Sequence, residues 1–341
     1  MIVHHEEPYN AETPRAELAA ADLTPNDRFY VRSHGPVPET DARVRVDGLV
    51  ERPLELDLGD LPRHELVVTL QCAGNRRAGL IAVRDIPGEA PWGPGATGTA
   101  RWRGVPLSDV LARAGVRAEA AHVAFVGADL SPEADPPQPF GASIPLAKAP
   151  DVLLATEMGG EPLPRAHGGP VRAVVPGYIG ARSVKWLERI ELRAEPWNGY
   201  FQAVAYRMLA PHEQPGRGRG FALGEVALNA DILRPGDGET VPAGEVELLG
   251  YAYAGGARTV ARVDVSTDGG ATWTRAELLA DLGRWAWRRW RATVTLAPGE
   301  HELLARAWDS AGATQPEHAA ALWNPKGYAN NAYGRITVRV T

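Results

Sequence analysis

The strongest constraint on the fold is the last third of the chain, where short segments of alternating apolar and polar residues follow one another from about residue 225. Turn residues separate these segments at a spacing typical of two packed antiparallel sheets. The pair Asp-Gly in the run TDGG is a hairpin signal. The segments are EVELLGYAYAG, ARVDVSTDGGATWTRAEL, WAWRRWRATVTL, HELLARAWDS and GRITVRV. Residues 225–341 are therefore predicted to form an all-β sandwich.

The preceding residues, from about 40 to 200, mix strand-like runs with a few helical pieces. ELVVTLQ is typical of a buried strand, and PLSDVLARAGV of a short helix with Ser108 as its N-cap and Gly115 beyond its end. Other strands are expected at ARVRVDGLV, AHVAFVGAD, VRAVVP and VKWLERIELRA. Strands and helices do not alternate regularly, as they would in a doubly wound sheet. A mixed α/β domain is expected over residues 1–210, and the chain as a whole is assigned to the α+β class.

Two segments contain features associated with nucleic-acid binding, and each has a simpler interpretation. Residues 210–224, APHEQPGRGRGFALG, hold a single GRGRG copy, and their Gly and Pro content without an apolar period indicates a linker. In the run Trp285–Arg291 we expect the tryptophans to face the sandwich core and the arginines to face solvent. The formal net charge is −6, so no general attraction to nucleic acid is expected.

The composition is that of an ordinary globular protein. One Cys among 341 residues cannot form an intramolecular disulfide. No stretch approaches eighteen uninterrupted apolar residues, so no membrane span is expected. The N-terminal sequence MIVHHEEPYNAETPRAEL is acidic and polar and lacks the apolar region of a secretory signal. A cytoplasmic location, with no membrane partner, is therefore the expectation, with a periplasmic location as the alternative if a leader has been removed.

The single cysteine, Cys72, lies in a segment suited to chemistry, LVVTLQCAGNRRAGL. It ends an apolar run and is followed by the turn Ala-Gly-Asn and by Arg76 and Arg77. Nearby cations lower the pKa of a thiol and favour the thiolate, which is both a nucleophile and a metal ligand. A nucleophile would need a histidine as its base, from among His34, His122 and His167. Three interpretations follow for Cys72: a small buried side chain, a nucleophile, or a ligand of a soft metal.

Three other segments combine glycines, cations and hydroxyls, a composition suited to phosphate and other oxyanions. FYVRSHGPVP places Arg32 and His34 two residues apart, on the same side of an extended segment. The segments PRAHGGPVR and GARSVKW add His167, Arg172, Arg182, Ser183 and Lys185. Together with Cys72 they predict an anionic ligand beside a sulfur-ligated centre. One cysteine cannot form a closed zinc site or an iron–sulfur cluster.

Several long motifs resemble the sulfite oxidase family. They are LQCAGNRR, PWGPGATGTARWRGVPL, GASIPLAKA, LLATEMGGEPLPRAHGGPVRAVVPGYIGARSVKWL and WNPKGYANNAYGRITVRV. The resemblance runs from EEPYNAETPR to the last strand, and the chain is most similar to the plant-type members, which have no haem domain. It implies a molybdenum–molybdopterin cofactor without haem. It also implies a molybdopterin-binding catalytic domain over 1–210, and an immunoglobulin-like dimerisation domain over 225–341 that forms a homodimer.

The resemblance assigns roles to individual residues. Cys72 matches the family's cysteine, whose thiolate ligates molybdenum. The positions that match cofactor-binding residues are Tyr30, Arg32, Ser33, His34, Asp129, His167, Arg172, Ser183, Val184 and Lys185. The positions that match the family's substrate pocket are Arg32, Arg77, Trp92, Tyr206 and Lys326. Lys326 departs from the vertebrate pattern, which has arginine there, so the charge is kept and the bidentate fork is lost.

The activity implied is oxidation of sulfite to sulfate by oxygen-atom transfer. In it the cations offset the charge of the anion, Tyr206 donates a hydrogen bond and Trp92 forms a wall. The alternative on the same fold is nitrate reduction, whose enzymes lack a tyrosine at the position of Tyr206 and usually have an uncharged residue at that of Lys326. A cofactor-free binding protein on this scaffold and a cysteine hydrolase are the alternatives from other classes. The electrons are expected to pass to oxygen or to a separate carrier such as a cytochrome c, and the sequence does not choose between them.

Overall fold

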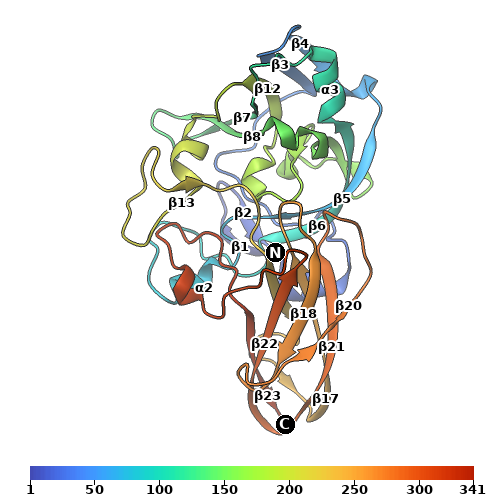
Figure 1. Ribbon diagram of the computed structural model, residues 1–341, viewed down its shortest axis with the longest axis vertical. Helices are drawn as coiled ribbons and strands as arrows, with labels where there is room; N and C mark the ends of the chain where they lie inside the picture. Colours follow the sequence, from blue (N-terminus) through green and yellow to red (C-terminus); the bar gives the residue numbers. More distant parts are fainter.

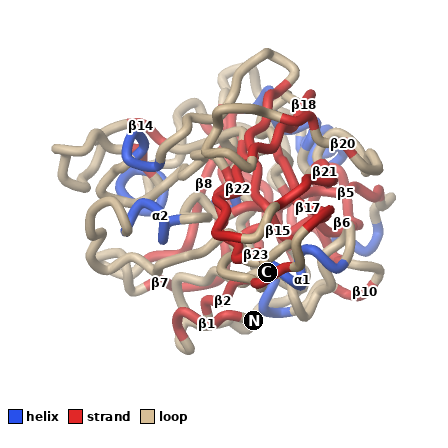
Figure 2. The backbone as a smooth tube through the Cα atoms, turned by 90° about the horizontal axis from the view of Figure 1, so that it is seen from below, coloured by secondary structure: helices blue, strands red, loops and turns tan.

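The two halves of the chain form the two ends of an elongated molecule (Figure 1). The computed structural model describes residues 1–341, apart from the side chain of Asp60. Mixed strands and short helices form the upper end in Figure 1, and long strands of a sandwich form the lower end. Figure 2 shows how short the helices are beside the strands and loops. The α+β class and the C-terminal sandwich are therefore confirmed.

One five-stranded sheet of the upper end leads to the cysteine. Its order is β10–β9–β6–β5, and β11 also pairs with β9, along residues 153–155. Along β5 the residues from Val68 to Gln71 are buried, whereas the first residues of the strand are exposed. Cys72 therefore follows the inner end of this strand. The bounds are β5 His64–Gln71, β6 Thr97–Pro106, β9 Leu153–Met158, β10 Glu161–Pro162 and β11 Arg172–Val174.

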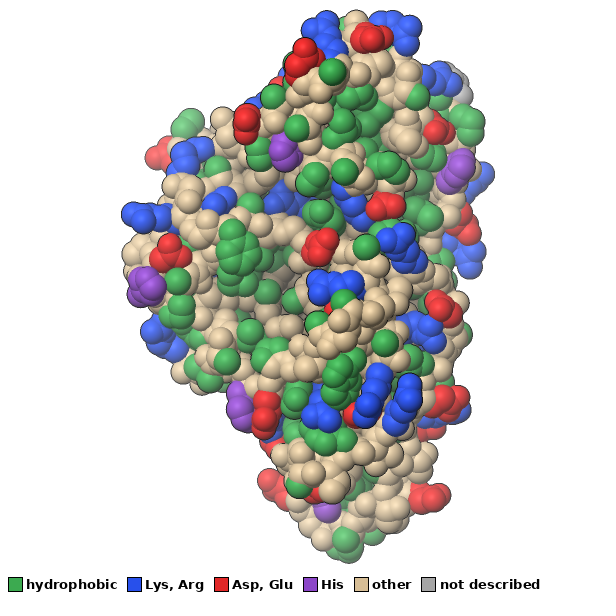
Figure 3. Space-filling view, in the orientation of Figure 1, with side chains coloured by type: hydrophobic (Ala, Val, Ile, Leu, Met, Phe, Trp, Pro, Cys, Tyr) green, Lys and Arg blue, Asp and Glu red, His purple; other side chains and the backbone are tan. Residues whose placement is uncertain are grey.

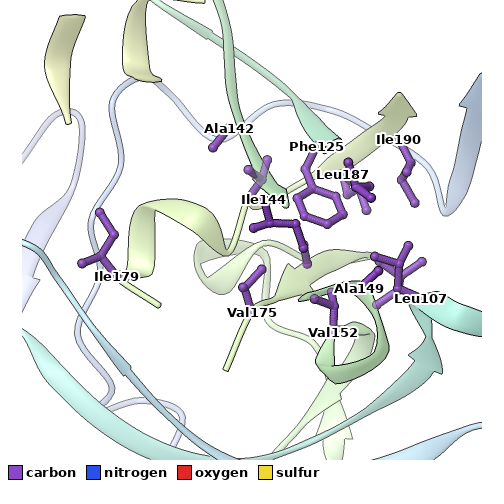
Figure 4. Close-up of a cluster of buried hydrophobic side chains, with 14 of the residues drawn as sticks. Leu107, Phe125, Ala142, Ile144, Ala149, Val152, Val175, Ile179, Leu187 and Ile190 are labelled. Atoms are coloured by element: carbon purple, nitrogen blue, oxygen red, sulfur yellow. The ribbon is translucent and has the colours of Figure 1, made fainter. Parts of the chain in front are cut away.

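A second five-stranded sheet has the order β4–β3–β12–β7–β8, in which β12 runs parallel to β3 and antiparallel to β7. Its apolar face packs on a cluster that includes Phe125, Ile144 and Leu187 (Figure 4). These side chains are fully buried or nearly so. The bounds are β3 Arg43–Gly48, β4 Leu54–Asp57, β7 His122–Ser131, β8 Gln138–Pro145 and β12 Leu187–Arg193.

The helices are short, and one of them differs from its prediction at its start. Helix α3 spans Leu107–Ala114 and has Pro106 at its N-cap, so Ser108 lies inside the helix. The prediction of Ser108 as N-cap is wrong because the fixed φ of Pro106 begins the helix earlier. Gly115 ends the helix as predicted, with φ of 70°. The other helices are α1 Arg15–Ala20 and α2 Arg77–Ile81, with 3₁₀ turns at Leu58–Asp60, Leu146–Asp151, Arg165–His167, Gly180–Arg182 and Ala319–Leu322. None of the helices in the described chain is long and apolar enough to cross a bilayer.

The lower end is a sandwich of two antiparallel sheets, whose orders are β15–β17–β21–β20 and β16–β23–β22–β18–β19, with β16 alone parallel to its neighbour. The sheets enclose an apolar core that contains Leu248, Trp290 and Ile336. The first sheet consists of β15 Asn229–Arg234, β17 Gly244–Tyr253, β20 Glu277–Leu278 and β21 Arg288–Leu296. The second consists of β16 Thr240–Val241, β18 Val260–Ser266, β19 Thr274–Arg275, β22 Gly299–Asp309 and β23 Gly334–Val340.

The run Trp285–Arg291 connects the two ends of the molecule, and only part of its prediction holds. Trp290 faces the sandwich core, and Trp287 is buried against the upper end, where its backbone N–H donates to Thr69 Oγ1 at 2.7 Å. Arg289 is buried, contrary to the prediction that the arginines face solvent. Its guanidinium donates to three carbonyls at the C-terminal end of α1, those of Leu18, Ala19 and Ala21. Helix ends leave such carbonyls without intrahelical partners. Arg289 is buried because its guanidinium supplies the missing donors.

The predicted linker, 210–224, is a loop that ends in β14, Phe221–Ala222, and this strand pairs with β13, Arg207–Met208. A single turn of π-helix, Phe201–Ala205, precedes β13 and leads directly to Tyr206. At the N-terminus β1, Ile2–His5, pairs with β2, Asn10–Glu12. These connections place the N-terminal segment and the region after the π-turn beside the cysteine loop.

Candidate cofactor and substrate site

A pocket of about 640 Å³ lies at the inner end of β5 and collects every predicted cofactor-binding residue. Cys72 and Tyr206 also line it. The contributing elements are the segment 29–34, the end of β7, the 3₁₀ turns at 165–167 and 180–182, and the residues that follow each turn. The structure therefore brings together segments that are far apart in the sequence.

Cys72 is the first residue of a tight turn. Its backbone N–H donates to Ala96 O at 2.9 Å, and Asn75 N donates to Cys72 O at 3.0 Å. The N–H of Gly74 points at the sulfur, with an N to Sγ distance of 3.4 Å. Burial raises the pKa of the thiol, and Arg77 and Arg32 offset this only in part. Arg77 and Arg32 act in the direction expected of nearby cations, but desolvation of the buried thiol is the larger effect.

Asp129 offers an unpaired acceptor inside the pocket. Its Oδ1 is buried and has no hydrogen-bond partner among the described residues. Burial raises the pKa of this carboxyl to about 6, while nearby Lys185 acts in the opposite direction. Lys185 donates to Ser33 Oγ at 2.7 Å and to Ala166 O at 3.1 Å, and burial holds its pKa well below the usual value.

These groups fit molybdopterin. A pterin ring presents N–H donors, which an unpaired buried carboxylate oxygen can accept, and a phosphate presents anionic oxygens, which a buried ammonium can pair with. Asp129 and Lys185 supply this pair of features in one pocket, and Cys72 supplies a sulfur at the same pocket. Buried polar groups without partners are rare in folded proteins, so the orphan oxygen indicates a ligand that donates to it.

Arg172 holds two of the pocket loops together. Its Nη1 donates to His167 O at 2.7 Å and its Nη2 to Ser183 O at 2.9 Å. Ser183 in turn accepts from Val175 N at 3.0 Å, and His167 Nε2 lies 2.8 Å from Asn26 O. Arg172 therefore orders the loops on which the predicted ligand-binding residues lie.

Tyr206, His34 and Glu133 form a hydrogen-bonded chain from the pocket toward solvent. His34 Nε2 lies 2.7 Å from Tyr206 Oη, and His34 Nδ1 lies 2.6 Å from Glu133 Oε1. Burial lowers the pKa of His34 to about 4, and Arg32 contributes in the same direction. The pKa of Glu133 lies near 2: burial acts to raise it, but the hydrogen bond and charge of His34, with Arg32, outweigh that effect. An ionised Glu133 accepts from Nδ1–H, which leaves Nε2 as the acceptor for the tyrosine O–H.

Arg32 takes part in the same cluster. Its Nη2 lies 3.0 Å from His34 Nδ1 and 3.4 Å from Glu133 Oε1, and its Nη1 donates to Ser33 O. The predicted proximity of Arg32 and His34 is thus found. Arg32 lines the pocket together with Cys72.

Arg77 and Lys326, which come from the two ends of the molecule, share one carboxylate. Arg77 Nη2 lies 3.2 Å from Glu89 Oε2, and Lys326 Nζ pairs with Glu89 Oε1. Arg77 Nε donates to Lys326 O at 3.1 Å, and its Nη1 donates to Ala90 O at 3.0 Å. Gly327 packs so closely on Arg77 that a Cβ there would lie 2.6 Å from the arginine Cγ, and its φ is +59°. The loop that carries Lys326 and Gly327 therefore closes over Arg77.

Tyr328 links these cations to the pocket. Its ring stacks on that of Tyr206, with centroids 5.5 Å apart and planes inclined by 17°. The guanidinium of Arg77 lies over the same ring, 5.3 Å from its centroid. The side chains of Arg77, Tyr328 and Tyr206 thus form a continuous contact between the cations and the pocket.

Two predicted residues lie deeper in the structure. Trp92 is fully buried in the core cluster that also contains Cys72 and Tyr30, and its ring meets that of His4 at 4.7 Å. It is not among the residues that line the pocket, so its role as a substrate wall stays a prediction. Tyr30 is buried and lines the pocket beside Phe29, whose ring stacks on it at 5.3 Å.

Three residues of the site were not predicted: Glu89, Glu133 and Tyr328. Tyr328 adjoins the Lys326 turn in the motif WNPKGYANN, so its proximity to Lys326 was a usable signal. Glu89 and Glu133 lie in loops where a carboxylate is ordinarily a solvated side chain. Tertiary contacts alone bring them to the site.

Charged side chains elsewhere are mixed in sign. On the face in Figure 3, Lys and Arg are interspersed with Asp and Glu, and the face is hollowed near its middle. This distribution agrees with the net charge of −6, and it shows no extended basic area on this face.

Two family models match the chain. Residues 34–201 match the oxidoreductase molybdopterin binding domain, and residues 221–341 match the Mo-co oxidoreductase dimerisation domain. The fold and the site thus define a molybdopterin-dependent oxidoreductase. The chain belongs to the sulfite oxidase family.

Individual relatives agree with this assignment. The chain is 43% identical to mitochondrial sulfite oxidase of Homo sapiens over 99% of its own length, and it spans 66% of that protein. It is 38% identical to sulfite oxidase of Arabidopsis thaliana over 99% of its length and spans 93% of that protein. The sulfane dehydrogenase SoxCD of Paracoccus pantotrophus has a similar structure, with a TM-score of 0.81 and 28% identity over 96% of this chain and 86% of that one.

Proposed function

We propose that the protein oxidises sulfite to sulfate by oxygen-atom transfer at a molybdenum–molybdopterin centre. The observation that carries the proposal is the adjacency of a pocket lined by Cys72 and the orphan Asp129 to a cluster of cations joined to it through Tyr206. The similarity to sulfite oxidases over nearly the whole chain supports the same substrate.

The residues that would hold the cofactor are those of the pocket. Cys72 would ligate the metal, Asp129 would accept from the pterin, and Lys185 would pair with the phosphate. When bound, the group supplies two-electron redox chemistry and oxygen-atom transfer. The protein supplies position, charge and proton transfer.

Binding of the oxyanion falls to Arg32, Arg77 and Lys326. A partly buried site strengthens their attraction for an anion, and loss of one such donor at comparable sites lowers the rate by about 10²–10³. Tyr206 donates its hydroxyl hydrogen to His34, and the same oxygen can accept from a neighbouring donor at the pocket.

Proton release is the remaining task, because sulfite and one water give sulfate, two protons and two electrons. The chain Tyr206–His34–Glu133 leads a proton from the pocket to a carboxylate whose side chain is 39% exposed. His34, neutral above its low pKa, can accept the proton at Nε2 and release one from Nδ1 to Glu133. The two electrons pass one at a time to oxygen or to a separate carrier such as a cytochrome c, and the presence of haem in this chain is not expected.

The test is steady-state turnover with purified, molybdenum-loaded protein. Sulfite should reduce ferricyanide catalytically, with about one molybdenum per chain. Reduction of nitrate without oxidation of sulfite would show instead the nitrate reductase activity of the same fold. Stopped-flow reoxidation with oxygen or with a cytochrome c identifies the acceptor.

We also infer a homodimer, supported by the match of residues 221–341 to the dimerisation domain. Light scattering during size-exclusion chromatography should give twice the chain mass of 36.6 kDa. A cytoplasmic location is part of the same proposal, and fractionation of cells that express the full-length protein tests it.

A further inference from the structure

A carboxylate occupies the place where the two substrate-binding cations meet. Glu89 pairs through Oε2 with Arg77 and through Oε1 with Lys326. The exposed fractions of these side chains are 17% for Glu89, 4% for Arg77 and 21% for Lys326, so all three are largely removed from water. Such charge-assisted contacts are stronger than those between exposed ions.

The orientation of Arg77 leaves one nitrogen for an anion. Nε and Nη1 donate to the carbonyls of Lys326 and Ala90, which fix the plane of the guanidinium. The third nitrogen, Nη2, pairs with Glu89, and it lies beside Gly74, where a Cβ would approach it within 2.6 Å. Gly74 also donates its N–H to the sulfur of Cys72. Nη2 therefore lies on the Cys72 side of the arginine, where a substrate oxyanion would have to bind.

The field of Glu89 reaches the groups around the pocket. Burial raises the pKa of Tyr206 and of Tyr328, and the charge of Glu89 raises both further. A negative charge within reach of both tyrosines also opposes the approach of a dianion. The carboxylate thus acts on an incoming oxyanion twice, by occupying its donors and by repelling it.

The loop that carries Glu89 is loosely packed just before this residue. Gly88, just before it, has a φ of +78°, and a Cβ there would meet nothing within 4 Å. Trp92, three residues after it, is anchored in the core. Displacement of the carboxylate therefore does not require the core to unpack.

On the basis of the proposed function, we propose that Glu89 is an internal competitor for the oxyanion subsite formed by Arg77 and Lys326. It weakens the binding of both sulfite and sulfate at that subsite, and it promotes product release by returning to the two cations when sulfate leaves. Glu89 is accordingly a specificity-determining residue that limits affinity for divalent oxyanions.

The test removes the charge and measures anion binding apart from turnover. In molybdenum-loaded protein, Glu89→Gln should bind sulfate about tenfold more tightly by titration calorimetry, the effect of one freed charge-assisted contact. The KM for sulfite and the inhibition constant of sulfate should fall by a similar factor, while kcat stays level or declines because product leaves more slowly. Glu89→Ala is the second variant. It removes the charge and also lacks the side-chain oxygen that glutamine would retain near the two cations.

Glu157→Gln is the matched control. Glu157 also bridges two cations, Arg63 at 2.6 Å and Arg103 at 3.2 Å, and its side chain is 20% exposed. It is not among the residues that line the pocket. This variant should bind sulfate as the wild type does.

The proposal is overturned if both Glu89 variants bind sulfate no more tightly than the wild type. It is also overturned if both fail to fold, because Glu89 would then be a structural bridge. Failure of the proposed function has a different signature. If the wild-type protein does not oxidise sulfite while Glu89→Gln still binds sulfate more tightly than the wild type, the proposed activity is refuted. The role of Glu89 as a competitor for the oxyanion subsite then still holds.

Discussion

The Tyr206 hydroxyl lies 2.7 Å from Nε2 of His34, and this contact connects the cofactor pocket to a carboxylate at the surface. The other ring nitrogen of His34 lies 2.6 Å from Glu133 Oε1. The arrangement resembles the orienting carboxylate of a general-base histidine, in which the carboxylate fixes the tautomer and stabilises the imidazolium. Here the base would serve the tyrosine rather than a nucleophile.

Glu133→Gln should therefore lower kcat for sulfite by about 10²-fold, the lower end of the contribution of general acid–base groups, because Tyr206 and His34 remain in place. The KM should change less than kcat, since Arg77 and Lys326 are untouched and Arg32 loses only a contact of 3.4 Å with Glu133. A kcat–pH profile is the second measurement. The glutamine oxygen can still accept from Nδ1–H, but the negative charge that raises the pKa of His34 is lost, so the acidic limb of the profile should move to lower pH.

The control for this experiment is Glu277→Gln, which breaks an exposed ion pair with Arg291 in the sandwich. Its kcat and its pH profile should match those of the wild type. Equal kcat values for Glu133→Gln and the wild type across the pH range would mean that the proton leaves by another route.

Cys72→Ser should abolish sulfite oxidation, because a serine hydroxyl does not replace a thiolate as a ligand for a soft metal. The substitution is nearly isosteric and the turn at Gly74 depends on backbone contacts, so folding should be preserved. Circular dichroism and the thermal midpoint of the variant verify the fold, and ferricyanide reduction measures activity. Turnover of Cys72→Ser at the wild-type rate would show that Cys72 is not a ligand of the reaction centre.

Asp129→Leu should lower the amount of molybdopterin retained after purification, since the orphan Oδ1 would no longer accept from the pterin. Loss of one such hydrogen bond to a charged group corresponds to a weakening of about tenfold or more. The stability of the cofactor-free variant should equal or exceed that of the cofactor-free wild type, because an unpaired buried carboxylate is costly. Extraction and fluorescence of the oxidised pterin give the occupancy, and urea unfolding gives the stability. Full occupancy in Asp129→Leu would contradict the role assigned to this oxygen.

Much of the architecture follows from local pattern. The sandwich strands keep one face in the core, so their alternation was visible, and Trp290 is buried as that pattern requires. Arg289, the residue before it, is buried for a reason outside the strand, namely the free carbonyls at the end of α1. Contacts between elements distant in sequence leave no periodic signal.

The site divides in the same way. The pocket residues lie in motifs whose glycines, cations and hydroxyls indicate anion binding, and the structure gathers them around one cavity. The state of the Cys72 thiol could not be predicted, because it depends on burial outweighing Arg77, and burial is a tertiary property. The role of Glu89 could not be predicted either, since it depends on the tertiary contacts that bring Arg77 and Lys326 to the same carboxylate.

The stability of the protein should fall as the pH falls from about 6.5 toward 4, in part through His167. Burial lowers the pKa of His167 to about 4, with Arg172 and Lys185 acting in the same direction and the Asn26 carbonyl against them. Between these pH values the unfolded chain binds a proton at this histidine that the folded chain does not, so acid favours unfolding. His167→Asn removes this contribution and keeps a polar side chain. Urea unfolding at pH 7 and pH 5 should show that the wild type loses about 2 kcal/mol more than the variant. Equal losses would mean that His167 titrates in the folded protein as it does in the unfolded chain.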